Sequence, residues 1–200
     1  MANKKQIDSI TSSLQQQLSR LAAGKPVNDN KIHTRNVPAT DLIMRGLAHF
    51  CGASAQWLPE YSYVADWLAN NHGKGLLCYG NCGRGKTLIT QRILPVIFQR
   101  YGYVLSCFTA LDLNEHYKDI ECCKLICIDD IGTEPEQNDF GERHWRFSEL
   151  VDLCERKDKL LIVSTNMTGD ELLARYGERT IDRLATLTTQ VLFKGNSLRK

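Results

Sequence analysis

The sequence lacks any apolar run that approaches the roughly 18 residues needed to span a membrane. It also lacks an apolar signal core near its start, because residues 1–5 lead into polar sequence. Internal repeats and low-complexity tracts are absent as well. We therefore expect neither secretion nor contact with a membrane, and we expect a cytoplasmic location.

Neither charge nor metal-binding spacing identifies a function. The 25 basic and 23 acidic residues leave a net charge of +2, which gives no overall footprint for nucleic acid. The eight cysteines include no Cys-x-x-Cys pair, and the histidines form no HExxH motif. Cys78, Cys107 and Cys127 lie in apolar runs, where buried thiols act as small apolar side chains. We therefore do not expect a zinc site.

Five short apolar runs alternate with helical patterns after residue 74. The runs are residues 75–79, 103–108, 124–128, 160–164 and 190–193. Runs that are apolar on both faces and separated by helices are typical of a parallel sheet covered on both sides. A chain of 200 residues can bury roughly 70% of its unfolded surface, so it needs no disulfide or metal to build a core.

The sequence before residue 75 predicts helices and a linker. Apolar residues at steps of three and four in residues 1–30 predict one amphipathic helix, which docks on its own domain or on a partner. The polar stretch 25–38 contains two prolines and predicts a linker. Residues 41–50 and 60–71 predict two further short helices.

One segment fits the phosphate-loop pattern G-x-x-x-x-G-K-[ST]. It consists of Gly80, Asn81, Cys82, Gly83, Arg84, Gly85, Lys86 and Thr87. It follows an expected strand and opens an expected helix, so backbone N–H groups and the helix N-terminus can meet phosphates. We expect Lys86 to reach the β- and γ-phosphates of ATP and the Thr87 hydroxyl to bind Mg²⁺. Pro95 predicts a kink or an early end in the following helix.

Polar residues end two other expected strands, where ligand sites of open parallel sheets lie. We expect Asp129 to join the Mg²⁺ shell beside Thr87, and Asp130 to orient or deprotonate the attacking water. Because aspartate is shorter than glutamate, slow and switch-like hydrolysis is expected. Asn166 either holds the same water or the γ-phosphate, or is a plain turn residue.

Two arginines, Arg179 and Arg183, lie four residues apart and so on one helical face. With Ile181 and Leu184 buried opposite, they would point outward. Such a pair is either a solvated face or, in an ATPase that assembles, a group that stabilises the γ-phosphate charge in a neighbour's site.

Five segments in this order resemble the DnaC-type helicase loaders, which are AAA+ ATPases related to the IstB-type transposition helpers. The segments are GLLCYGNCGRGKT (75–87), LICIDDIGTE (125–134), STN (164–166), GERTIDRL (177–184) and VLFKGNSLR (191–199). The resemblance implies an α/β P-loop NTPase of AAA+ type. In such a fold a parallel five-stranded sheet is flanked by helices, the lid is reduced or absent, and a small helical N-terminal appendage precedes the sheet.

The resemblance also implies roles for the residues already named. By this resemblance Lys86 and Thr87 belong to the Walker A motif, and Asp129 and Asp130 to the Walker B motif. Asn166 would be sensor 1, and Arg199 matches a sensor-2 position. Arg183 would be the arginine finger, and Arg179 a second contact between subunits. Residues 1–60 would form a helical segment that grips the replicative helicase, and residues 61–200 the ATPase domain. The implied cofactors are ATP and Mg²⁺, and the implied partners are the replicative DNA helicase, single-stranded DNA and an ATP-dependent homo-oligomer.

Two other functions remain open at this point. An IstB-like transposition helper ATPase would coat DNA and deliver a transposase, and a neighbouring transposase gene would favour it. A small-molecule P-loop kinase would need an acceptor pocket and an arginine-bearing lid, for which the sequence offers no dedicated candidate.

Overall fold

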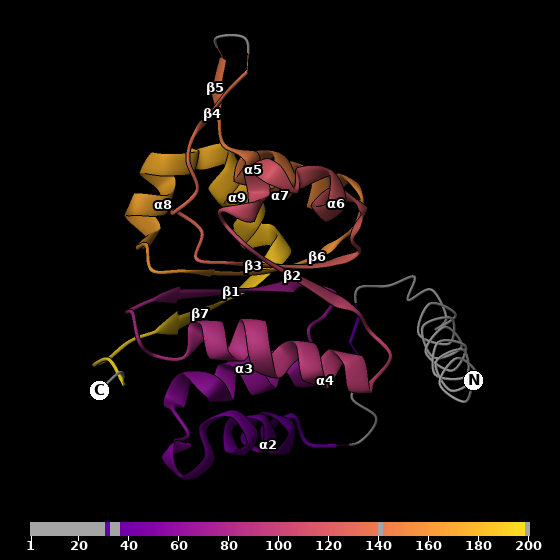
Figure 1. Ribbon diagram of the computed structural model, residues 1–200, viewed down its shortest axis with the longest axis vertical. Coiled ribbons are helices and arrows are strands. Elements are labelled where there is room, and N and C mark those ends of the chain that lie inside the picture. The colour runs from indigo at the N-terminus through magenta and orange to yellow at the C-terminus, as the bar shows by residue number, and fades with distance from the viewer. Residues whose placement is uncertain (1–30, 33–36, 140–141, 199–200) are drawn as a thin grey trace, which may run out of the picture.

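The computed structural model describes residues 31–32, 37–139 and 142–198. The amphipathic stripe expected in residues 1–30, most of the expected linker, and Arg199 lie outside these residues. The described chain forms three layers, with one sheet between two layers of helices (Figure 1). Among these residues, no helix is both long enough and apolar enough to cross a membrane.

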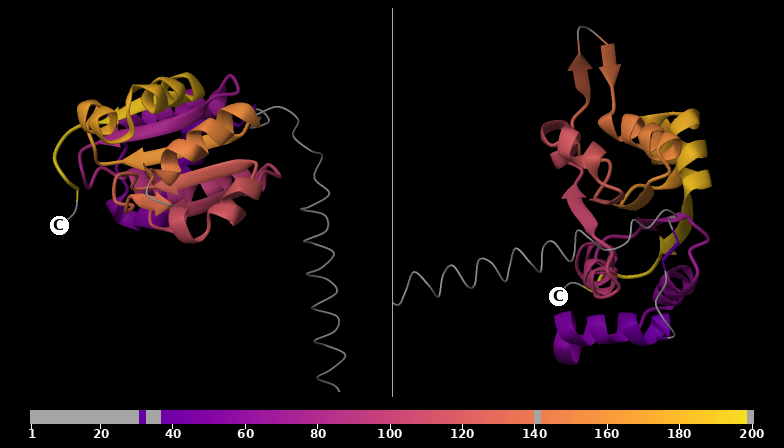
Figure 2. Two further views of the ribbon diagram at one scale, coloured as in Figure 1. Left: turned by 90° about the horizontal axis from the view of Figure 1, so that it is seen from above. Right: turned by 90° about the vertical axis from the view of Figure 1, so that its right-hand side faces the viewer.

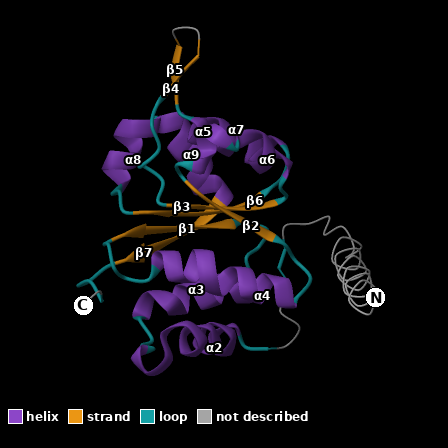
Figure 3. Ribbon diagram, viewed as in Figure 1, coloured by secondary structure: helices purple, strands orange, loops and turns teal. Residues whose placement is uncertain are grey.

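The middle layer is a parallel sheet of five strands in the order β2-β3-β6-β1-β7 (Figure 3). The strands are β1 (Gly75–Gly80), β2 (Leu105–Thr109), β3 (Leu125–Asp129), β6 (Leu160–Thr165) and β7 (Thr188–Phe193). The five strands expected from the sequence are confirmed, although β2 begins two residues later and β7 two residues earlier than predicted. All five carboxyl ends therefore meet at one edge of the sheet.

Helices cover both faces of this sheet. One layer holds α2 (Ala39–Cys51), α3 (Pro59–Ala69), a π-helical segment (Leu88–Ile93) and α4 (Leu94–Arg100), with a 3₁₀ turn (Gly52–Ser54) after α2. The other holds α5 (Asp112–Glu115), α6 (Tyr117–Cys122), α7 (Arg146–Arg156), α8 (Gly169–Tyr176) and α9 (Glu178–Leu187). Residues 194–198, which follow β7, are not helical.

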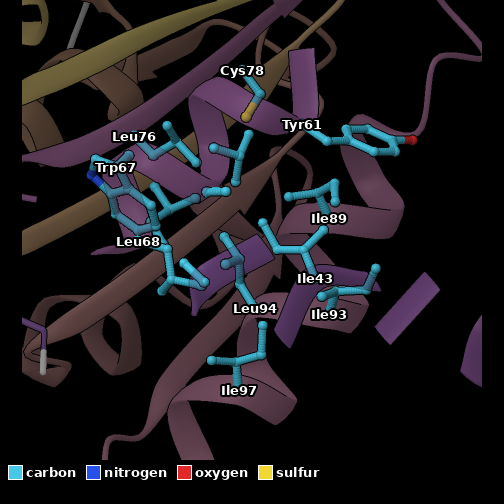
Figure 4. Packing of buried hydrophobic residues seen from close by; sticks show 14 of the residues in the cluster. Ile43, Tyr61, Trp67, Leu68, Leu76, Cys78, Ile89, Ile93, Leu94 and Ile97 are labelled. Carbon is cyan, nitrogen blue, oxygen red and sulfur yellow. The ribbon is translucent and has the colours of Figure 1, made fainter. Parts of the chain in front are cut away.

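Alternating strand residues feed two separate cores. Leu76 and Ile162 pack with α2, α3 and α4 on one side, as Figure 4 shows for part of that cluster. Leu77 and Val163 pack with α7, α8 and α9 on the other side. Successive residues of a strand point to opposite faces of the sheet. Because helices cover both faces, these strands are apolar at almost every position.

The helix after the phosphate loop changes its hydrogen bonding where the sequence predicts a break. The backbone N–H of Leu94 bonds to the carbonyl of Ile89, five residues earlier, and α4 then begins with Pro95 in its first turn. Proline lacks the N–H that an uninterrupted α-helix needs, and a π-helical turn accommodates this loss.

The expected domain boundary at residue 60 stays a prediction. One buried cluster contains residues from both sides of this position. Leu42, Ile43 and Leu47 of α2 belong to the same buried cluster as Ile93 behind the phosphate loop. A Cβ built on Gly46 would lie 2.6 Å from Ile93 Cγ2, so α2 approaches this helix closely. The described residues of α2 therefore pack in one core with the sheet.

A two-stranded antiparallel hairpin projects from the helical layer (Figure 2). It consists of β4 (Gln137–Asp139) and β5 (Glu142–His144). The sequence analysis does not anticipate it, because these polar strands lack the apolar alternation that marks a half-buried strand.

Candidate nucleotide-binding site

The phosphate loop spans the gap between β1 and the π-helical segment, as expected. Gly85 has a φ of +88°, and a Cβ built on it would lie 2.3 Å from Tyr61 Oη. Glycine is therefore required there by both conformation and space. Burial, followed by the nearby Glu60 carboxylate, raises the pKa of Tyr61 to about 12. The neutral phenol donates to the Arg84 carbonyl at 3.2 Å and supports the loop from α3.

Lys86 lies at the centre of the site with all three ammonium protons engaged. Its Nζ donates to the carbonyls of Gly80 and Asn81 at 2.8 and 2.9 Å, and to Asn166 Oδ1 at 2.8 Å. Burial lowers its pKa, and nearby groups, among them Asp130 and Asp129, raise it in part. The ammonium group is thus held by two backbone carbonyls and by the Asn166 side chain, and a ligand can replace the side chain.

The acidic residues at the end of β3 are connected to the phosphate loop after β1 and to the end of β6. Thr87 Oγ1 donates to Asp129 Oδ1 at 3.2 Å, while Asn166 Nδ2 donates to Asp130 Oδ1 at 2.6 Å. Asn166 therefore bridges Lys86 and Asp130 from the end of β6. The side chains that the sequence placed at three separate strand ends come together here.

A cavity of about 460 Å³ opens beside these groups. Seven of the residues predicted from the sequence line it: Cys82, Gly83, Gly85, Lys86, Thr87, Asp130 and Asn166. Further lining comes from residues that the sequence analysis did not single out: Leu47, Cys51, Ser54, Gln56, Tyr61, Leu88, Ser164 and Leu198. The cavity therefore extends from the phosphate loop to α2 and the turn that follows it.

The side chains of Asn81 and Arg84 do not line this cavity and instead anchor the loop. Arg84 forms an ion pair with the buried Glu60 of α3, with Nε and Nη2 each 2.8 Å from Oε1. Asn81 Nδ2 donates to the carbonyl of Gly195 at 2.9 Å, and the Leu198 N–H donates to the Gly83 carbonyl at 2.9 Å. The loop is therefore held between α3 and the segment after β7.

Asp129 and Thr87 offer a pair of oxygen ligands suited to Mg²⁺. A hydroxyl and a carboxylate are oxygen donors of the kind that Mg²⁺ prefers. Their side chains are already within hydrogen-bond distance of one another, at the end of the loop that would hold the phosphates. The residues present thus fit the expected metal.

The two arginines of α9 share one face but lie outside the cavity lining. Arg183 donates from Nη1 to Asp152 of α7 and from Nε to Glu155 at 3.0 Å. Arg179 lies 3.5 Å from the other Asp152 oxygen and is 76% exposed. The hydrogen bond to Asp152 raises the pKa of Arg183, so the guanidinium stays charged. Both arginines are thus held by acidic residues of their own chain.

Two residues that hold the site in place, Ser164 and Glu60, were also missed by the sequence analysis. Ser164 is 2% exposed and bonds to both acidic residues at the end of β3, and the only signal for it in the sequence is its place in the STN segment. Glu60 is 4% exposed, and nothing in its local sequence marks it as the partner of Arg84.

Comparison with known proteins identifies the fold. No family model and no curated protein sequence matches the chain. Among solved structures, the chain is similar to a crystal structure of the DnaC helicase loader, with a TM-score of 0.51 and 20% identity, over 81% of this chain and 93% of that one. It is also similar to a crystal structure of DnaI, with a TM-score of 0.51 and 16% identity, over 80% of this chain and 87% of that one. At these identities the likeness concerns the fold alone, a parallel five-stranded sheet flanked by helices.

Proposed function

We propose that this protein is an ATP-binding and ATP-hydrolysing replication factor that binds the replicative helicase and assists its loading on single-stranded DNA. The observation that carries the proposal is the joining of Lys86, Asn166 and Asp130 at one end of a DnaC-type sheet, beside Thr87 and Asp129. The DnaC match supports the loader role because that protein is described as a helicase loader.

The residues divide the work on ATP between them. The phosphate loop offers backbone N–H groups and the Lys86 ammonium to the phosphates. Thr87 and Asp129 would hold Mg²⁺, which supplies charge neutralisation on the β- and γ-phosphate oxygens. Asp130 accepts a proton from, or orients, the attacking water, and Asn166 fixes the Asp130 carboxylate through its amide.

The contact between Lys86 and Asn166 favours a switch. The γ-phosphate must compete with Asn166 for the Lys86 ammonium, so ATP binding breaks the Lys86–Asn166 contact and frees the end of β6 to respond. A short Asp130 side chain, where glutamate would reach further, is consistent with slow hydrolysis. Arg183 and Arg179 would enter the site of a neighbouring copy after release from Asp152.

The nucleotide part of the proposal is tested with Lys86→Ala and a matched surface variant, Lys118→Ala. We expect Lys86→Ala to lose binding of a fluorescent ATP analogue by at least about tenfold, since an ammonium–phosphate contact contributes about 1.5–3 kcal/mol. Lys118 is exposed, so its variant should bind as the wild type does. Equal, tight binding by both variants would refute the nucleotide site.

The helicase part is tested by size-exclusion chromatography with the replicative helicase of the same host, with and without ATP analogue. Residues 1–30 are removed in the comparison chain, because a deletion to residue 60 would strip α2 from the core. Co-elution that is lost on this deletion supports the loader role and places the contact in residues 1–30. No co-elution in either state, together with DNA-dependent filament formation, would favour the transposition helper instead.

A further inference from the structure

Ser164 occupies an unusual place between the two acidic residues of the site. It lies near the carboxyl end of β6, paired in register with Cys78 of β1, and is 2% exposed. Its hydroxyl donates to Asp129 Oδ1 and accepts the backbone N–H of Asp130 at 3.1 Å. One hydroxyl therefore contacts both residues that the proposed hydrolysis requires.

The first contact fixes the Asp129 carboxylate. Its Oδ1 accepts hydrogen bonds from both Ser164 and Thr87. Both of these hydrogen bonds are made to Oδ1, and among the described residues Oδ2 accepts neither of them. Two donors on one oxygen restrict the rotation of the carboxylate, because turning it away from this orientation would lengthen both bonds.

The second contact fixes the backbone of Asp130. This residue has a φ of +61°, a left-handed conformation that costs a non-glycine residue free energy. Its N–H is held by Ser164, and its carbonyl accepts from the Thr133 hydroxyl at 2.9 Å. The turn directs the Asp130 carboxylate to Asn166 Nδ2, so a relaxed turn would break the link to sensor 1.

We propose that Ser164 is a positioning residue for ATP hydrolysis, which with one hydroxyl orients the Asp129 carboxylate for Mg²⁺ and holds Asp130 in its left-handed turn. The inference rests on the proposed ATPase function. It deepens that function by naming a residue that acts through Asp129 and Asp130. A donor that also accepts is required, so alanine removes both contacts, cysteine weakens both at similar size, and threonine retains both.

The test compares Ser164→Ala, Ser164→Cys and Ser164→Thr in the full chain, with Ser106→Ala on β2 as the matched control. Three quantities are measured: binding of a fluorescent ADP analogue in EDTA, binding of Mn²⁺ in the presence of ADP by electron paramagnetic resonance, and kcat as a function of Mg²⁺ concentration. Mn²⁺ serves as the spectroscopic probe of the Mg²⁺ position.

We expect Ser164→Ala to keep its metal-free ADP affinity within about twofold while Mn²⁺ affinity falls about 10- to 100-fold, as on loss of a group that orients a metal ligand. The Mg²⁺ concentration for half-maximal activity should rise in parallel. Threonine should restore both within about threefold, and Ser106→Ala should change neither. Should the alanine variant fail to fold, the cysteine variant decides, with the same direction expected.

Unchanged Mn²⁺ affinity and Mg²⁺ dependence in the folded alanine or cysteine variant would overturn the inference and leave the ATPase intact. Loss of metal-free ADP binding equal to the loss of Mn²⁺ binding would also overturn it, because a merely structural residue gives that pattern. A wild-type protein that binds no nucleotide would instead overturn the proposed function itself.

Discussion

The buried ion pair behind the phosphate loop allows a prediction of stability. Arg84 and Glu60 side chains are 11% and 5% exposed, and two guanidinium nitrogens lie 2.8 Å from the same carboxylate oxygen. Removing one partner of such a pair costs about 3–5 kcal/mol, because a buried charge is left uncompensated. Glu60→Gln keeps the side-chain volume and one acceptor, so we expect the lower end, about 3 kcal/mol.

The assay is urea unfolding at pH 7, followed by tryptophan fluorescence, with Arg84→Met and the double variant completing a cycle. At this chain length about 3 kcal/mol corresponds to a fall in melting temperature of roughly 6–12 °C. The double variant should lose far less than the sum of the single variants, because it buries no lone charge. Since Arg84 lies within the phosphate loop, Glu60→Gln should also weaken ATP binding.

An exposed pair supplies the matched control. Lys124 Nζ lies 4.0 Å from Asp158 Oδ2, and these side chains are 42% and 77% exposed. Such pairs contribute about 0–1 kcal/mol, and asparagine tolerates the left-handed backbone of Asp158, so Asp158→Asn should change stability little. A cost below about 1 kcal/mol for Glu60→Gln, or additive single variants, would refute the reasoning.

Three further outcomes are expected. Gly85→Ala should abolish binding of an ATP analogue, since the new Cβ would lie 2.3 Å from Tyr61 Oη at a φ of +88°, and retained binding would contradict the loop geometry. Hydrogen bonds from the Thr168 backbone and hydroxyl hold the pKa of Glu171 below its usual 4.5, so this stabilisation is present above pH 4.5 and is lost as pH falls through the lowered value. Glu171→Gln should therefore lower the melting temperature more at pH 7 than at pH 3, and an equal effect at both would count against it. Phe147→Ala should lower the free energy of unfolding in urea by about 3–5 kcal/mol, because the ring is fully buried between α7 and the sheet. A loss under about 1 kcal/mol would show that neighbouring side chains move in to fill the cavity.

Local patterns in the sequence predict the parts of the fold that depend on local physics. Strands with apolar residues on both faces predict a buried parallel sheet, as β1 does with Leu76 on one face and Leu77 on the other. The spacing of Arg179 and Arg183 predicts one shared face, and both do reach Asp152. The phosphate loop is likewise read from its own residues.

Contacts between residues far apart in the chain cannot be predicted from local sequence patterns. Glu60 and Arg84 come from separate elements, and neither reveals its partner by periodicity. The same holds for Ser164, whose role depends on two residues of another strand. The hairpin of β4 and β5 was missed for a different reason, because polar strands that leave the body bury no apolar face.

The support of the phosphate loop by the segment after β7 has a consequence for synthesis of the chain. The bonds from Asn81 to Gly195 and from Arg84 to Asn196 join residues 114 and 112 positions apart. At about 5–20 residues per second, a ribosome needs roughly 6–22 s to add this length. The loop therefore leaves the ribosome long before the backbone that braces it, and a nascent chain should gain its nucleotide affinity only once residue 198 has emerged.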